Sequence, residues 1–231
     1  MEIKGSTALV TGANRGMGRH FAEQLVARGA TVYAGARNPD TVIFKGVTPV
    51  ALDITDTGSV STAARELRSV NLLINNAGIA SRGPLLAGNP ADIGDDLKTN
   101  YLGTLNMTRA FAPVLLANGG GAIVNMLSAL SWVTMPDLGA YSVSKSAEWA
   151  LTNAVRQELA GQGIQIVGVH VGPVDTDFTR ELDFPGKADP AAVVAAALDG
   201  LQAGDLEVLA DELSHAVRAG LAGGVPALYP R

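Results

Sequence analysis

Short apolar runs recur along the whole chain, separated by stretches with helical periodicity. Runs that are apolar throughout, rather than alternating with polar residues, are typical of strands in a parallel sheet covered on both faces. The pattern therefore predicts a buried parallel sheet. Its predicted strands are Ser6–Thr11, Thr31–Ala36, Thr48–Leu52, Leu72–Asn75, Ala122–Met126, Ile164–Val171 and Glu207–Ala210.

Helical periodicity occurs in the intervals between these runs. It predicts a first helix that ends at Gly29 and further helices near 57–70, 90–117, 140–161 and 189–203. Asn89 and Asp189 are each followed by proline, which is the pattern of an N-cap with proline at the first helical position. Strands that alternate with helices indicate right-handed βαβ units. No linker, repeat or low-complexity segment divides the chain, so residues 1–231 are predicted to form one α/β domain. Its doubly wound parallel sheet should carry helices on both faces.

Composition narrows the class of protein. The 231 residues are 47% hydrophobic, enough for a substantial core, and the net charge of −5 without a basic block argues against a nucleic-acid surface. The absence of cysteine excludes disulfides and thiolate sites, and His20, His170 and His215 show no metal-ligand spacing, so no metal is expected. Residues 1–5 reach the first strand too quickly for a signal peptide, and no apolar run is long enough to cross a membrane. A soluble, cytoplasmic protein is the expectation.

A glycine-rich turn, Gly12-Ala-Asn-Arg-Gly16-Met-Gly18, lies between the first predicted strand and the first helix. Strand, glycine turn and helix are the context of a dinucleotide site, because the backbone can approach a pyrophosphate and the helix N-terminus offers free N–H groups. The spacing is G-x-x-x-G-x-G rather than G-x-G-x-x-G. The alternative is a turn that binds no ligand.

Tyr141 and Lys145 are four residues apart, so on a helix they share a face with Cβ atoms about 5–6 Å apart. A phenol titrates near pH 10, and lowering its pKa by about three units would take roughly 4 kcal/mol of differential interaction with a neighbouring ammonium. Tyr141 is thus a candidate general acid/base for a carbonyl or an alcohol. Ser128 is the candidate second hydroxyl, preferred over Ser131 because it directly follows a strand. No G-x-S-x-G motif surrounds it, which argues against a serine hydrolase.

Five motifs occur in a fixed order between about residue 5 and residue 177: Thr11–Gly18, Asn75–Gly78, Asn100, Ser128 and the segment Tyr141–Lys145. In this order they resemble the short-chain dehydrogenase/reductase family. The resemblance implies a single-domain Rossmann-like fold, a nicotinamide cofactor and a catalytic set of Asn100, Ser128, Tyr141 and Lys145.

The resemblance also implies a mechanism. Ser128 and Tyr141 would hold the carbonyl oxygen, Lys145 would hold the phenolate and the ribose, and Asn100 would hold a water that relays protons. The expected activity is reversible, NADPH-dependent reduction of a ketone or aldehyde to an alcohol by hydride transfer. The alternative is an NADP(H)-binding sensor on the same fold with incidental turnover.

Charge favours NADP(H) over NAD(H). An acidic residue after the second strand would repel a 2′-phosphate, but the chain has Ala36 and then Arg37, with Arg15 in the glycine turn as a second cation. Two solvated surface arginines are the alternative. The predicted cofactor-binding set is Gly12, Asn14, Arg15, Gly16, Met17, Gly18, Arg37, Asp53, Ile54, Asn76, Ala77, Gly78, Tyr141, Lys145, Gly172, Val174 and Thr176.

The substrate side is less clearly marked. Leu130, Trp132 and Phe178 are predicted to line the pocket, and the segment 177–188 is short for a substrate lid, which suggests an open pocket and a bulky or apolar carbonyl substrate. Arg82 or Arg180 would instead suit an acidic one.

Two further features depart from the family or bear on assembly. Val171 stands where the family usually has proline, and 211–231 form an atypical ending, with a helix over Glu212–Leu221.

A homo-oligomer, dimer or tetramer, is expected through the helices at 90–117 and 140–161. Trp149, Ala150, Leu151 and Val155 suit either that interface or the core.

Overall fold

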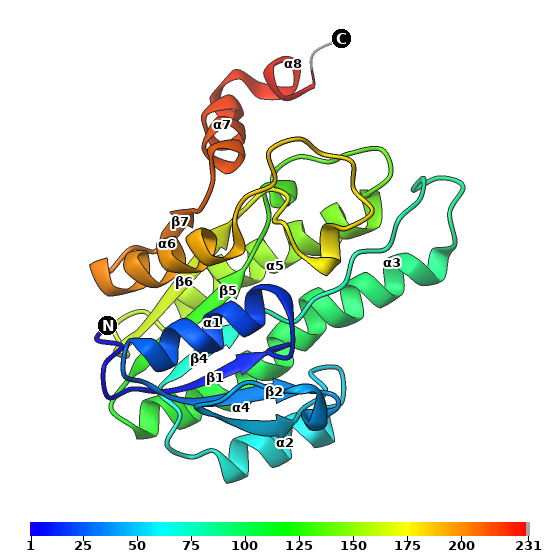
Figure 1. The fold of residues 1–231 in the computed structure, drawn as a ribbon. Helices are drawn as coiled ribbons and strands as arrows, with labels where there is room; N and C mark the ends of the chain where they lie inside the picture. The colour runs from blue at the N-terminus through cyan, green and yellow to red at the C-terminus, as the bar shows by residue number, and fades with distance from the viewer. Residues whose placement is uncertain (230–231) are drawn as a thin grey trace.

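The computed structural model describes residues 1–229, which form one domain around a seven-stranded parallel sheet in the order β3-β2-β1-β4-β5-β6-β7 (Figure 1). The predicted Rossmann-like, doubly wound fold is confirmed, and the strands begin and end within a few residues of the predicted positions. The order reverses between β1 and β4, and a sheet of this kind binds ligands where the order reverses. The strands are β1 Thr7–Thr11, β2 Thr31–Ala36, β3 Val47–Ala51, β4 Leu72–Asn75, β5 Gly121–Met126, β6 Ile164–His170 and β7 Glu207–Leu209.

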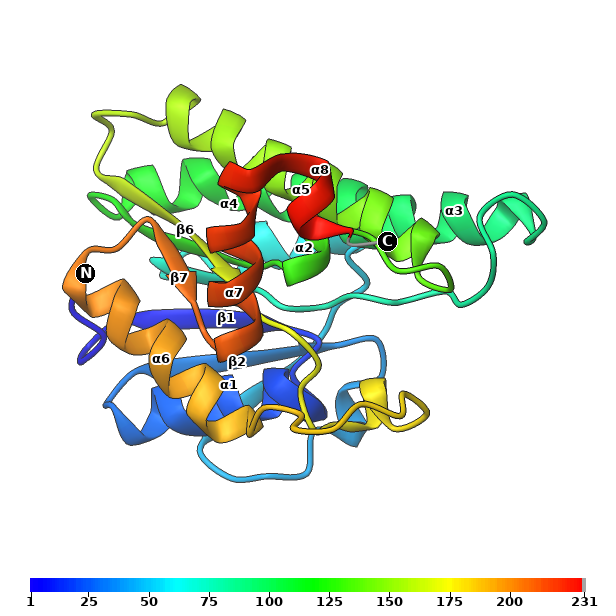
Figure 2. The ribbon, with the colours of Figure 1, turned by 90° about the horizontal axis from the view of Figure 1, so that it is seen from above.

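Helices cover both faces of the sheet. On one face, α1 (Gly16–Ala27) and α6 (Pro190–Ala203) bury Phe21, Leu25 and Leu198 against the strands. On the other face lie α2 (Thr57–Glu66), α4 (Thr104–Ala117) and α5 (Gly139–Glu158), whose buried side chains include Val60, Phe111 and Leu151 (Figure 2). Leu151 and Val155 are therefore core residues, whereas Ala150 is exposed.

Both proline-preceded caps form as the sequence predicts. The side chain of Asn89 accepts a hydrogen bond from the backbone N–H of Ala91 at 3.1 Å, and Asp189 accepts one from Ala191 at 3.1 Å. Each cap satisfies one of the free N–H groups at a helix start. These local signals place the first residues of α3 (Pro90–Asp96) and α6.

The helix predicted over 90–117 is interrupted. It consists of α3 (Pro90–Asp96), a π-helical segment (Leu97–Gly103) and α4. Within the π-helical segment, the side chain of Asn100 bonds the backbone of Ile79, with Oδ1 accepting from Ile79 N and Nδ2 donating to Ile79 O, both at 2.9 Å. Gly103 packs so closely that a Cβ there would lie 2.6 Å from Cδ1 of Ile54. Such one-turn bulges are frequent at functional sites.

The C-terminal part of the described chain stands away from the sheet. Here α7 (Glu212–Gly220) matches the predicted helix, and α8 (Gly224–Leu228) lies in what the sequence indicated as a tail (Figure 1). Asp211 anchors α7 at two points, because it accepts from Ser214 N at 2.9 Å and from Gly172 N at 2.8 Å. The tail's last two residues lie outside the described chain. No helix in the described part is long and apolar enough to cross a membrane.

Candidate active site

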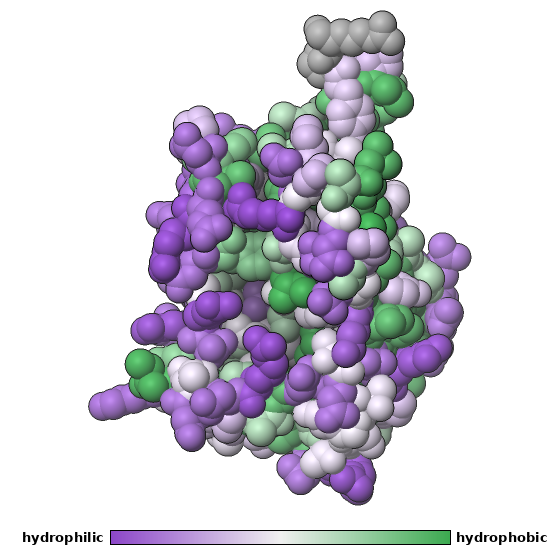
Figure 3. Space-filling view, turned by 90° about the vertical axis from the view of Figure 1, so that its right-hand side faces the viewer, coloured by the Kyte–Doolittle hydropathy of each residue, from purple (hydrophilic) through white to green (hydrophobic). Residues whose placement is uncertain are grey.

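A cavity of about 760 Å³ opens at the carboxyl ends of the central strands. Figure 3 looks onto this side of the molecule and shows apolar residues recessed between hydrophilic ones. The cavity is lined by most of the residues that the sequence singles out: Gly12, Asn14, Arg15, Gly16, Met17, Arg37, Asp53, Ile54, Asn76, Ala77, Gly78, Ser128, Leu130, Tyr141, Lys145, Gly172, Val174, Thr176 and Phe178. Gly18, Asn100 and Trp132 do not line it.

The glycine turn has the shape that a pyrophosphate requires. Gly12 and Gly16 adopt φ angles of 63° and 51°, which favour glycine, and a Cβ on Gly12 would lie 3.0 Å from Cα of Ala77. Arg15, the N-cap residue of α1, makes no side-chain cap, so the first N–H groups of the helix are free beside the cavity. These residues fit the phosphates of a dinucleotide.

Gly18 and Asn76 support the turn. A Cβ on Gly18 would lie 2.1 Å from the carbonyl oxygen of Gly12, so glycine here allows close packing and does not itself face the cavity. The side chain of Asn76 donates to the carbonyl of Thr11 at 2.9 Å, and its backbone N–H donates to Oγ1 of Thr11 at 3.0 Å. The strand ends β1 and β4 are thereby tied together under the turn.

Two exposed arginines border the adenosine end of the cavity. Arg15 and Arg37 line it, and neither forms an ion pair within the described residues. Asp53 lies beside them, and its pKa is lowered mainly by hydrogen bonds from Thr55 and further by the charge of Arg37. Exposed guanidinium groups without an ion-pair partner can form bidentate contacts with a phosphate.

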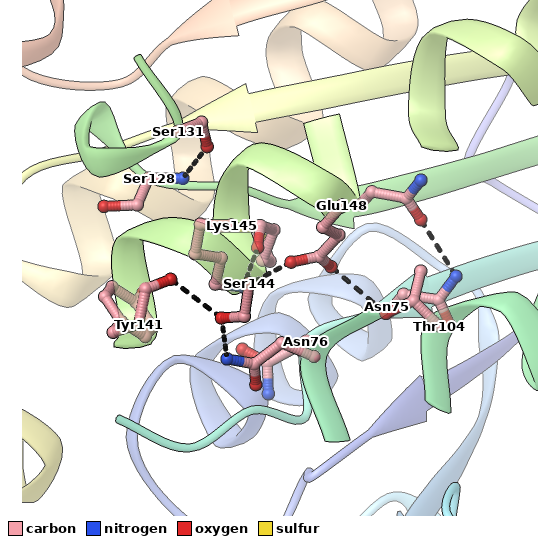
Figure 4. A network of polar contacts seen from close by, with 12 residues as sticks. Asn75, Asn76, Thr104, Ser128, Ser131, Tyr141, Ser144, Lys145 and Glu148 are labelled. Atoms are coloured by element: carbon pink, nitrogen blue, oxygen red, sulfur yellow. Dashed lines mark hydrogen bonds and ion pairs between the residues drawn. The ribbon is translucent and has the colours of Figure 1, made fainter. Parts of the chain in front are cut away.

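Three of the four predicted catalytic side chains, those of Ser128, Tyr141 and Lys145, meet at the opposite end of the cavity (Figure 4). Tyr141 and Lys145 lie one turn apart near the start of α5, with Nζ of Lys145 5.8 Å from the centre of the Tyr141 ring. Ser128 follows β5, and its Oγ accepts from Leu130 N at 3.1 Å. Ser131 is buried behind it and accepts from the backbone N–H of Ser128 at 3.2 Å. Ser128 is thus the serine that faces the cavity.

The pKa of Tyr141 is raised in the protein alone, not lowered as the sequence argument predicts. Burial raises it most, Lys145 lowers it, and the Glu148 carboxylate raises it again. The sequence prediction is wrong on this point because it counted only the ammonium of Lys145. It omitted both the loss of solvent around the phenol and the second charge.

Glu148 is the residue of the site that the sequence analysis missed. It is almost completely buried on α5, and its Oε2 lies 2.6 Å from Nζ of Lys145. Its Oε1 accepts from Oγ1 of Thr104, on α4, at 3.1 Å. The available signal was an acidic residue three positions after Lys145, hence on the same helix face.

Asn100 is fully buried outside the cavity. Besides its two bonds to Ile79, its Nδ2 donates to Oγ of Ser144 at 2.8 Å. The side chain therefore joins the π-helical segment, the loop residue Ile79 after β4, and α5. Its role in a proton relay stays a prediction.

The prediction that Trp132 lines the pocket is wrong. Its ring stacks on His170 at a centroid distance of 3.6 Å, and the guanidinium of Arg218 lies 5.6 Å from it. His170 lies on β6, next to β5 in the sheet. The stacking contact with it holds the Trp132 ring away from the cavity. Burial lowers the pKa of His170 to about 4, so the imidazole is neutral at neutral pH.

Apolar side chains from several separate segments complete the substrate end. They are Met135, Leu138, Leu182, Phe184 and Leu213. Leu213 comes from α7, and the sequence carried no signal for its position. Of the two arginines proposed for an acidic substrate, Arg82 lines the cavity, whereas Arg180 pairs with Asp177.

A fold and a site of this kind define a nicotinamide-dependent oxidoreductase, and comparison gives the family. Residues 6–184 match the family model of the short chain dehydrogenases. The chain therefore belongs to the short-chain dehydrogenase family, whose cofactors are nicotinamide dinucleotides.

Three relatives illustrate the likeness. An uncharacterised oxidoreductase of Escherichia coli, YbbO, is 34% identical over 79% of this chain and 71% of its own. The 3-oxoacyl-[acyl-carrier-protein] reductase FabG of Salmonella typhimurium is 30% identical over 85% of this chain and 84% of its own. A short chain dehydrogenase from Burkholderia cenocepacia, solved in complex with NADP, is 39% identical with a TM-score of 0.94, covering 99% of this chain and 98% of that one.

Proposed function

We propose that the protein is an NADPH-dependent carbonyl reductase that converts a ketone or aldehyde to an alcohol, reversibly. One observation carries the proposal. A single cavity is lined at one end by the glycine turn with Arg15 and Arg37, and at the other by Ser128, Tyr141 and Lys145. The first group suits a phosphorylated dinucleotide and the second suits a carbonyl oxygen that gains negative charge.

The side chains have separate tasks in this proposal. When bound, the nicotinamide supplies or accepts the hydride. The hydroxyls of Ser128 and Tyr141 donate to the carbonyl oxygen and stabilise the charge that develops there. Tyr141 then gives its proton to that oxygen, and the Lys145 ammonium stabilises the phenolate left behind.

The lining of the substrate end favours an apolar carbonyl compound. Leu138, Phe178 and Leu213 present hydrocarbon surface to the cavity, and the ring of Phe178 lies 6.1 Å from that of Tyr141. A ketone or aldehyde with a bulky hydrocarbon group would remove this surface from water. The name of the Salmonella relative, a 3-oxoacyl reductase, also supports reduction of a ketone.

The assay that tests this proposal follows NADPH absorbance with a panel of ketones and aldehydes. The panel runs from small to bulky apolar compounds and includes a 2-oxo acid and a sugar phosphate. We expect turnover to rise with apolar bulk, because only such compounds fill the lining described above. NADPH binding without turnover on any compound would contradict the proposal and favour a cofactor-binding sensor.

Arg37→Ala should reduce the preference for NADPH over NADH in kcat/KM by about 10–100-fold. A hydrogen bond to a charged group contributes about 1.5–3 kcal/mol, and that contact is absent with NADH. Steady-state kinetics with both cofactors measure the ratio. Arg65→Ala, an exposed arginine on α2, is the matched control and should leave the ratio unchanged. An unchanged ratio in Arg37→Ala would mean that Arg37 does not contact the 2′-phosphate.

A further inference from the structure

Glu148 is a buried acid that the proposed mechanism does not use. Both carboxylate oxygens have partners: Oε2 contacts Nζ of Lys145 at 2.6 Å, and Oε1 accepts from Oγ1 of Thr104 at 3.1 Å (Figure 4). The backbone carbonyl of Glu148 accepts from Oγ1 of Thr152 at 2.8 Å. The residue is thus fully bonded inside the protein, between α4 and α5, one turn from the predicted catalytic lysine.

Stability alone gives no reason for an acid at this position. Taking a carboxylate and an ammonium out of water is costly, and well-packed apolar side chains at such a pair are often as stable or more so. The same buried face of α5 accepts Leu151 and Val155 elsewhere. An apolar pair at 145 and 148 could therefore replace the ion pair without loss of stability, so the acid points to a role in the chemistry.

The contacts of Lys145 indicate what that role is. An ammonium has three donors. Two of them are directed to the carbonyl oxygen of Met126 at 2.7 Å and to Glu148, and Lys145 also lines the cavity. A hydrogen bond to Met126 and an ion pair to Glu148 fix the side chain and leave the third donor for the cavity.

We propose, on the basis of the proposed function, that Glu148 is a positioning residue that anchors Lys145 and offsets part of its charge, so that Tyr141 remains a protonated phenol ready to donate. The pair of Lys145 and Glu148 carries no net charge, wherever the shared proton lies. Tyr141 therefore stands beside an ion pair rather than beside a free cation, and the ammonium, whose effect on the phenol exceeds that of Glu148, still stabilises the phenolate once the proton has left. This setting favours the acid form of Tyr141, which is the form that carbonyl reduction consumes.

The charged groups around the phenol agree with this assignment. From its own helix, Tyr141 faces Lys145, which lowers its pKa, and Glu148, which raises it; Asp96, at the end of α3, also raises it. Burial on its own lowers the pKa of Lys145, yet the net shift is upward because Glu148 stabilises the ammonium. Removal of the Glu148 charge would leave an uncompensated cation and lower the pKa of Tyr141.

The test is a tyrosinate absorbance titration of Glu148→Gln and Glu148→Met, which reads out the phenol without turnover. The chain has four tyrosines, so subtracting the same variant carrying Tyr141→Phe isolates Tyr141. We expect the Tyr141 midpoint to fall by about one pH unit or more in both charge-removing variants. Glu148→Asp, which keeps the charge, should stay near wild type, and Glu158→Gln, at the exposed end of α5, is the matched control.

Activity supplies the second readout. The alkaline limb of carbonyl reduction should move to lower pH in Glu148→Gln, because Tyr141 loses its proton earlier. Wild-type midpoints in both charge-removing variants, or failure of both to fold, would overturn the inference and leave Glu148 a structural residue. A shifted titration midpoint in a protein that reduces no carbonyl would retain the inference and reject the proposed function.

Discussion

Tyr141→Phe should lower kcat for carbonyl reduction by about 10²–10⁴-fold while NADPH binding stays close to wild type. The variant loses the hydroxyl that gives the proton, a contribution of that size for a positioned acid. It keeps the ring that packs near Phe178, so the shape of the cavity is retained. NADPH-dependent kinetics measure the first effect, and fluorescence titration with NADPH measures the second.

Tyr33→Phe is the matched control for this variant. Tyr33 lies on β2, packs against the core beneath α2 and α4, and does not line the cavity. Its hydroxyl can be removed without touching the site, so activity should not change. If Tyr141→Phe kept more than about a tenth of wild-type kcat, the proton would have to come from another group.

Lys145→Met should destabilise the protein by about 3–5 kcal/mol at neutral pH, because it leaves the Glu148 carboxylate buried and unpaired. The double variant Lys145→Met with Glu148→Leu removes both charges and should recover most of that loss, since apolar pairs replace buried ion pairs well. Denaturant unfolding measures both free energies. Both variants should lack activity, which separates the structural effect of the pair from its chemical one.

The pH dependence of the stability of Lys145→Met tests whether the unpaired Glu148 carboxylate causes the loss. Without its partner, burial holds the pKa of Glu148 above its ordinary value of 4.5. The folded state then binds more protons than the unfolded state above that pH, so the stability of the variant should fall as pH rises. Lys45→Met, at an exposed lysine, is the control. Equal unfolding free energies for Lys145→Met and wild type would show that the pair is not charged in the native protein.

Local signals explain why much of the fold was predictable. Apolar runs located the strands, and proline after Asn89 and Asp189 placed two helix starts, because each signal depends on residues that are neighbours in sequence. The π-helical segment was not predictable in this way. It depends on the bonds between Asn100 and the backbone of Ile79, twenty-one positions earlier, and hydrophobic periodicity does not report such a contact.

The residues of the site also divide into those marked by local motifs and those that depend on long-range contacts. The glycine turn and the pair of Tyr141 and Lys145 are motifs of fixed spacing, so their presence at one cavity follows from the order of the strands. The position of Glu148, three residues after Lys145, is evident from the sequence. Its burial is not, because it depends on α4, which supplies Thr104. Trp132 was assigned to the pocket because it follows Ser128. The neighbouring strand β6 supplies the His170 ring that holds it elsewhere.

The π-helical segment also determines which side chains before α4 border the cavity. A π turn holds one more residue than the α turn it replaces, and each residue of an α-helix advances the chain by about 100°. With the extra residue, α4 keeps Phe111 in the core while Asp95 and Lys98 border the cavity. Deletion of one residue between Leu97 and Gly103 should rotate the preceding residues by about 100° relative to α4 and so turn Asp95 and Lys98 away from the cavity. Such a deletion should therefore change the lining of the cavity while Phe111 and the rest of the core keep their packing.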